Sequence, residues 1–161
     1  MPGPQMDTRE LEQRFQRWLD DRISNLPDDT FKISSEAPSE VHGQIIRLLP
    51  SNPEAAKVMV HFENPAQIDL TLGIGCHVEL YSKDVDQLES QFRGILDAVI
   101  DCGFEETVWR RGDRVLKSKG LLRLSGGTKK ITYRNWASPG KGKRSKSHFV
   151  YRPFSPRDAV L

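Results

Sequence analysis

Cysteine and long apolar runs are both scarce in this sequence. Its 161 residues include only two cysteines, Cys76 and Cys102. Two cysteines cannot build a disulfide framework, so we expect both to be reduced structural thiols. No apolar stretch approaches the ~20 residues that a membrane helix requires, and residues 1–9 lack the apolar segment of a signal peptide. These absences predict a cytoplasmic protein without a membrane partner.

The sequence also lacks the motifs of metal, nucleotide and nucleophile chemistry. Its four histidines are scattered, at His42, His61, His77 and His148. None of them has the spacing of a zinc-binding or metalloprotease motif. Gly73-x-Gly75 lacks the third glycine of a dinucleotide fingerprint, and residues 125–129 lack the spacing of a phosphate-binding loop. We therefore expect no metal and no cofactor, and an enzyme is the less favoured class.

Acidic residues are scarce in the last third of the chain and outnumber basic residues before it. Residues 1–113 contain 11 Lys/Arg and 21 Asp/Glu, whereas residues 114–161 contain 13 Lys/Arg and one acid, Asp158. The net charge of +2 therefore hides −10 followed by +12. Such a split indicates either a surface for an acidic partner or two halves that neutralise each other.

The strongest pattern lies in residues 67–103. Every second residue from Ile68 to Leu80 is apolar, which predicts one long half-buried strand with a kink or bulge at Gly73 and Gly75. From Val85 to Val99 the apolar spacing becomes helical. Asp84 is placed to cap this helix and Gly103 to end it. We expect residues 92–99 of the helix to pack on Leu70, Leu72 and Ile74.

Shorter elements flank this centre. Apolar residues at helical spacing predict an amphipathic helix from Asp7 to Leu26, which covers the sheet or mediates dimerisation. Strands are expected at 30–34, 41–49, 57–63, 105–111, 114–124 and 129–136. Gly112–Asp113 predicts a tight hairpin in which Glu106 faces Lys119 and Trp109 faces Leu116. Because the connections are short, antiparallel pairing is favoured.

These elements predict an α+β fold: one curved, mainly antiparallel sheet with the N-terminal and central helices packed on one face. We expect residues 1–6 to be a disordered tail and 7–136 a single domain. Residues 137–147 are rich in Gly, Ser and basic side chains, which is typical of a flexible loop. Residues 148–161 are expected to form a final strand or a docking tail.

One histidine–carboxylate pair can be placed by register. If residues 57–63 and the strand beginning at Gln67 form a hairpin, His61 faces Asp69. A carboxylate beside an imidazole is the arrangement of a general base, which makes the pair a weak catalytic candidate for a hydrolase. His77 and Glu79 share one strand face, but could hold a metal only with a third ligand from elsewhere.

The basic segment offers a second candidate. Lys141, Lys143, Arg144 and Lys146 lie close together in sequence and could neutralise phosphates. Trp136, Phe149 and Tyr151 flank them and could stack on bases. No known nucleic-acid motif accompanies them, so a solvated loop is the competing interpretation.

The sequence alone thus favours a small non-enzymatic binding domain with a protein partner. Nucleic-acid or other polyanion binding through the basic C-terminal third is the first alternative. A hydrolase using His61 and Asp69 is the second. Oligomerisation through the N-terminal helix stays open.

Overall fold

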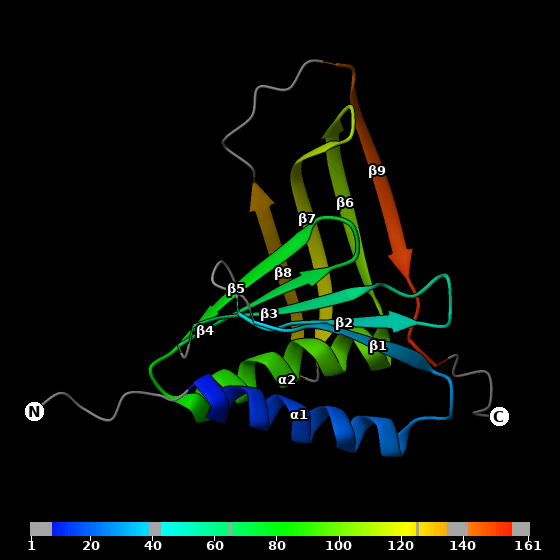
Figure 1. The fold of residues 1–161 in the computed structure, drawn as a ribbon. Helices are drawn as coiled ribbons and strands as arrows, with labels where there is room; N and C mark the ends of the chain where they lie inside the picture. Colours follow the sequence, from blue (N-terminus) through cyan, green and yellow to red (C-terminus); the bar gives the residue numbers. More distant parts are fainter. Residues whose placement is uncertain (1–7, 39–42, 65, 125, 135–141, 156–161) are drawn as a thin grey trace, which may run out of the picture.

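The computed structural model describes residues 8–38, 43–64, 66–124, 126–134 and 142–155. Two helices and nine strands make up these residues (Figure 1). In chain order they are α1 (Thr8–Asn25), β1 (Phe31–Glu36), β2 (Ile45–Pro50), β3 (Val58–Asn64), β4 (Gln67–Leu72), β5 (Cys76–Tyr81), α2 (Val85–Cys102), β6 (Phe104–Arg111), β7 (Arg114–Leu124), β8 (Gly127–Arg134) and β9 (Arg144–Tyr151).

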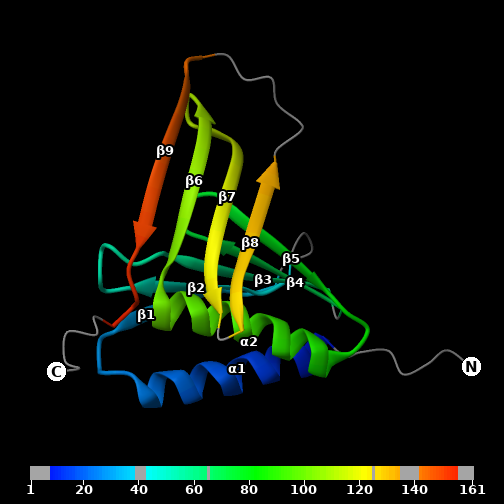
Figure 2. The ribbon, with the colours of Figure 1, turned by 180° about the vertical axis from the view of Figure 1, so that it is seen from behind.

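The strands form two antiparallel sheets, which confirms the α+β class and the antiparallel pairing. One sheet has the order β1-β2-β3-β4-β5 and the other the order β8-β7-β6-β9. The single curved sheet expected from sequence is thus divided in two. The helices lie under the five-stranded sheet, and the four-stranded sheet rises steeply from it (Figures 1 and 2). No described helix is long and apolar enough to cross a membrane.

Both helices bury their apolar stripes in one continuous core. Phe92, Leu96 and Val99 of α2 are fully buried together with Leu70 and Leu72 of β4. This confirms the expected helix face, but Ile74 keeps 40% of its surface exposed and does not belong to the core. The apolar side chains of α1 lie in the same core, and Phe15 contacts both Phe62 and Phe92 with ring centroids 5.4 and 5.6 Å apart.

Ion pairs fix α1 against α2. Arg14 binds Asp86, and its Nη1 lies 2.8 Å from Glu89. At the other end of the helix Arg22 lies 2.6 Å from Asp101. Part of the acidity of the first half is therefore matched between these two helices.

The expected strand through residues 67–80 is in fact a hairpin. β4 and β5 pair antiparallel, with Leu72 opposite Cys76. Gly73, which has a φ of 64°, begins the three-residue turn between them. The kink predicted at the two glycines is a complete reversal of the chain.

The register expected between residues 105–111 and 114–124 is wrong beyond the turn. Arg111 faces Arg114 as predicted, but a bulge follows at Trp109–Arg110. Because a bulge inserts one extra residue, Trp109 faces Lys117 and Glu106 faces Gly120. Lys119 instead faces Thr107.

The basic segment is partly strand. β9 begins at Arg144, so residues 144–147 of the expected loop pair with β6. The expected tail at residues 1–6 lies outside the described residues, as do Trp136 and Lys141.

Candidate functional site

Alternation along the four-stranded sheet divides its side chains between two faces. Glu106, Ser118 and Tyr133 point toward the five-stranded sheet: Glu106 bonds the Ile74 amide, Ser118 donates to the Gly75 carbonyl, and the Tyr133 ring contacts His77. The residues between them therefore point away from it. Figure 2 looks onto this outward side.

The outward side carries a dense set of cations, here called the basic face. Its members are Trp109, Arg111, Lys117, Lys119, Lys130, Arg134, Arg144 and Lys146. Their positions follow from the strand pairing: Arg134, Lys117, Trp109 and Lys146 are successive cross-strand partners from β8 to β9. Arg111 pairs with Arg144 at the end nearer the β6–β7 turn.

Trp109 lies at the centre of these cations. The ammonium groups of Lys117, Lys146 and Lys119 lie 5.1, 5.4 and 6.0 Å from its ring centroid. Each is within the range of a cation–π contact. Desolvation lowers the pKa of Lys117, and the neighbouring charges of Lys119 and Arg134 lower it further. The positive charges of these side chains are therefore close enough to act on one another electrostatically.

The acidic half of the chain does not neutralise this surface. Among the described residues, no ion pair includes Lys117, Lys119, Lys130, Arg144 or Lys146. Glu105 is the acid on this side of β6, and it lies 3.7 Å from Arg123 and 3.9 Å from His148. The expectation that the two halves simply cancel does not describe this part of the molecule.

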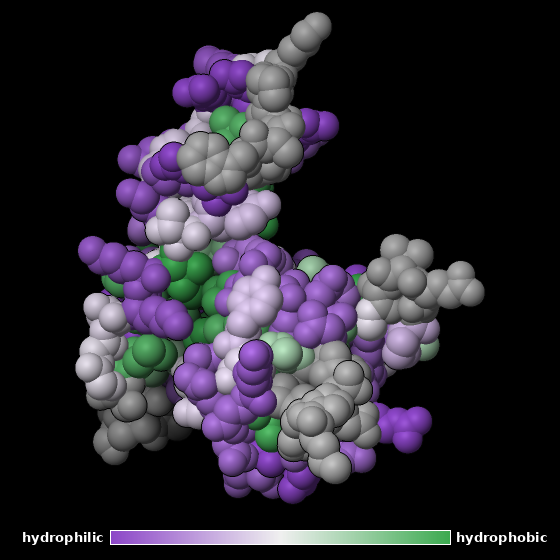
Figure 3. Space-filling model, turned by 90° about the vertical axis from the view of Figure 1, so that its left-hand side faces the viewer, coloured by the Kyte–Doolittle hydropathy of each residue, from purple (hydrophilic) through white to green (hydrophobic). Residues whose placement is uncertain are grey.

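The surface has shallow relief suited to contact with an extended ligand. One hollow is lined in part by Trp109, Lys117, Arg134 and Arg144. A second is lined in part by Lys119, Lys130 and His148. In the space-filling view the projecting sheet is mainly hydrophilic, and the molecule is hollowed between it and the five-stranded sheet (Figure 3).

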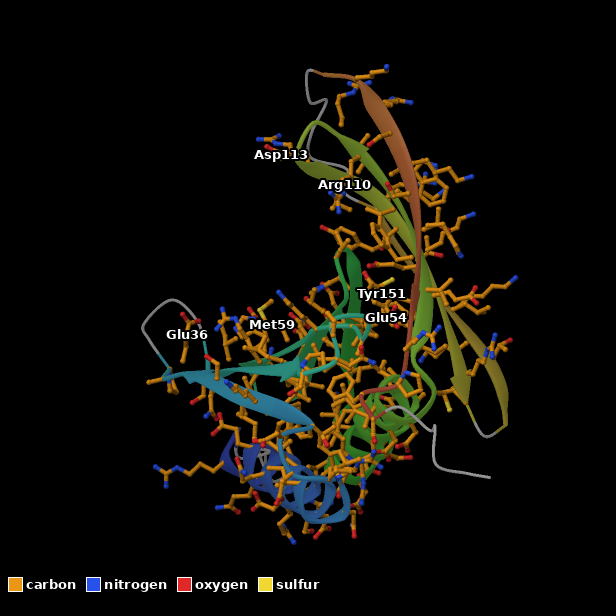
Figure 4. All side chains as sticks on the ribbon, turned by 90° about the vertical axis from the view of Figure 1, so that its right-hand side faces the viewer. Glu36, Glu54, Met59, Arg110, Asp113 and Tyr151 are labelled. Atoms are coloured by element: carbon orange, nitrogen blue, oxygen red, sulfur yellow. The ribbon has the colours of Figure 1, made fainter. Side chains whose placement is uncertain are left out.

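Phe149 and Tyr151, two of the three aromatic residues proposed from sequence as stacking partners, are on the wrong side, and the third, Trp136, lies outside the described residues. Phe149 and Tyr151 pair with Glu106 and Phe104 and belong to the inner face, where the Tyr151 ring stacks on Phe104 at 4.9 Å. Figure 4 shows Tyr151 where the two sheets meet, and Arg110 on the inner side of the projecting sheet. Among the residues that the structure describes, Trp109 is the aromatic side chain of the basic face.

Of the basic residues named from sequence, the structure brings two to this surface. Arg144 and Lys146 lie on β9, beside β6, whereas Lys143 is exposed just before the strand and Lys141 lies outside the described residues. Sequence reasoning missed the contributions of β7 and β8. The alternation Lys117-x-Lys119 was a usable signal, since it places two cations on one strand face.

The catalytic candidates lie elsewhere, on the five-stranded sheet. His61 and Asp69 are cross-strand partners, which confirms the predicted register. The imidazole Nδ1 of His61 lies 3.1 Å from Glu63. A histidine–carboxylate pair in a hydrolase serves a serine or cysteine nucleophile. Ser118 and Cys76 are fully buried between the sheets, where their side chains contact each other at 3.7 Å.

Comparisons with protein-family models, curated proteins and solved structures find no match for this chain. Function must therefore be argued from the surface itself.

Proposed function

We propose that this protein binds nucleic acid, as a single strand in the first instance, through the basic face. One observation carries the proposal: seven cations from four adjacent strands share with Trp109 a surface that faces away from the rest of the fold. Cations that neutralise phosphates release counterions, which is the main source of sequence-independent affinity for nucleic acid.

The arrangement favours an extended ligand. Strands in a sheet are about 4.8 Å apart. Arg134, Lys117 and Lys146, at corresponding positions of β8, β7 and β9, therefore form a closely spaced row with Trp109 of β6 between the two lysines. A single strand can follow such a row and stack a base on an aromatic ring, which contributes about 1–3 kcal/mol per base. Trp109 is already half-buried beneath its lysines, so binding requires the ammonium groups to move from the ring to phosphates.

The test compares two variants that remove the same charge. K119Q/K130Q/K146Q neutralises exposed lysines of β7, β8 and β9, whereas K32Q/K57Q/K83Q neutralises three exposed lysines of the other half. A labelled single-stranded oligonucleotide is titrated with each protein at about 50 mM salt, where non-specific binding in the ~10⁻⁴–10⁻⁶ M range is measurable. We expect the first variant to lose at least about tenfold in affinity and the second to lose little.

Two results would contradict the proposal. Wild-type protein that leaves the oligonucleotide unbound at 50 mM salt excludes it, and so does an equal loss in the two variants. If the basic face binds an acidic protein but no oligonucleotide, the protein-partner interpretation is supported instead. Circular dichroism checks that each variant keeps the wild-type fold.

A further inference from the structure

A cluster of metal-ligand side chains lies on the five-stranded sheet, on the face opposite the helices. Asp69 is at its centre, on β4, between His61 of β3 and Glu79 of β5. Asp69 is 8% exposed although it belongs to the outward face, and the Gln67 amide donates to it at 2.8 Å. A carboxylate buried among other polar side chains needs compensation of its charge.

The pairing around Asp69 is unfavourable without a cation. Asp69 and Glu79 are directly opposite each other, and like charges in that position destabilise a sheet. Glu63 of β3 adds a third carboxylate, since its ligand atom and those of His61 and Asp69 lie within 4.8 Å of one another. Acidic side chains therefore gather on this part of the sheet.

An imidazole completes the set. Ligand atoms of Asp69, His77 and Glu79 all lie within 4.8 Å of one another. The Nε2 atom of His77 is 3.6 Å from Glu79, while its Nδ1 lies 3.4 Å from Thr71 Oγ1. Ligand atoms of a tetrahedral zinc site are about 3.3–3.6 Å apart, given bonds of about 2.0–2.2 Å. The His77–Glu79 distance meets this value, and the separations from Asp69, which are at most 4.8 Å, would shorten on binding by rotation of its side chain.

We propose that Asp69, His77 and Glu79 form a site for one divalent transition-metal ion, with Zn²⁺ the best match. An imidazole with two carboxylates selects Zn²⁺ over Mg²⁺, which prefers oxygen ligands alone. Three protein ligands leave a fourth position for water or another group. Thr71 beside Nδ1 orients the ring so that Nε2 faces the ion. Asp69 supplies the third ligand that the His77–Glu79 pair lacked in the sequence.

Calorimetric titration of the metal-free full chain with ZnCl₂ tests the site. A C102S background removes the exposed thiol, which could bind zinc itself. We expect one ion per chain, no comparable binding of MgCl₂, and an affinity loss of at least about 10–100-fold in H77Q and in D69N. H148Q, which changes an exposed histidine of the other sheet, should bind zinc as the parent does.

H77Q is the decisive variant because its side chain is partly exposed and its loss leaves the core intact. An H77Q protein that keeps the parent affinity overturns the proposal, as does loss of binding in H148Q. H61Q probes the overlapping set of His61, Glu63 and Asp69. A larger loss in H61Q than in H77Q would also overturn the assignment.

Discussion

Glu106 holds the two sheets together. Its carboxylate is 1% exposed and accepts hydrogen bonds from the amides of Ile74 and Gly75 at 2.7 and 3.2 Å. The Tyr151 hydroxyl donates to it as well. Burial raises the pKa of Tyr151, and the bond to Glu106 raises it further, so the phenol stays a donor. A Cβ at Gly73 would lie 2.5 Å from this carboxylate, which explains the glycine.

We predict that E106Q destabilises the protein by about 1–3 kcal/mol, because its amide group turns one acceptor into a donor facing other donors. Urea unfolding measures the change. E105Q is the matched control: the neighbouring side chain lies on the outward face, where substitutions usually change stability by less than about 0.5 kcal/mol. Equal effects in the two variants would mean that Glu106 does not anchor the turn.

Cys76 is expected to be chemically silent. Burial raises the pKa of its thiol, and the nearby Glu106 charge raises it further, to about 12. The thiol therefore stays protonated at all pH values below that, and the nucleophile of disulfide exchange is the thiolate. We predict that a disulfide reagent at pH 8 modifies one thiol, that of exposed Cys102, in the native protein and two in denaturant. Fast reaction of two native thiols would contradict the burial of Cys76.

At the scale of elements, the apolar pattern of the sequence predicted which side chains face the core more accurately than it predicted where the chain turns. The β4–β5 hairpin shows why. Its turn has three residues, so Leu72 is paired with Cys76 and even-numbered residues stay on one face through the reversal. Unbroken alternation is therefore the same for one long strand and for two short ones. Only the excessive length and the two glycines indicated an irregularity.

The basic face was hidden for a related reason. The β6–β7 bulge inserts a residue, and a shift of one residue exchanges the faces of a strand. The register predicted across the turn paired Trp109 with apolar Leu116. Because of the bulge, Trp109 is instead paired with Lys117. The pairing of β9 with β6 was not predictable either, because it joins residues about 40 apart with no local signal.

One glycine inside α2 and one that ends it allow a matched prediction. Gly103 ends the helix with a φ of 71°, and a Cβ there would lie 2.1 Å from the Tyr151 carbonyl oxygen. Gly94 is inside the helix and exposed, with nothing within 4 Å of a Cβ. We predict that G94A stabilises the protein by up to about 1 kcal/mol, while G103A destabilises it by more than that through strain. Thermal melts of both variants check this, and a neutral G103A would mean that the helix ends differently.

At the scale of the whole molecule, acidic and basic side chains are concentrated in different parts of the fold. Arg14 pairs with Glu10, Asp86 and Glu89, and Arg22 with Asp97 and Asp101, beneath the five-stranded sheet. Lys117, Lys119, Lys130 and Lys146 of the four-stranded sheet lie on the face that points away from that part of the structure. A net charge of only +2 thus coexists with a strongly one-sided field. Such a field can steer a polyanion to one face while the remainder repels it.

This one-sidedness predicts how salt acts on binding. Affinity for a single strand should fall linearly with salt on logarithmic axes, with a slope of about −0.7 for each phosphate contacted. If Lys119, Lys130 and Lys146 each contact one phosphate, K119Q/K130Q/K146Q should reduce the magnitude of the slope by about 2. K32Q/K57Q/K83Q lowers the net charge equally but should leave the slope unchanged, since those lysines lie outside the basic face. Titrations at several salt concentrations provide both slopes. Parallel slopes for the two variants would show that net charge, and not the basic face, attracts the strand.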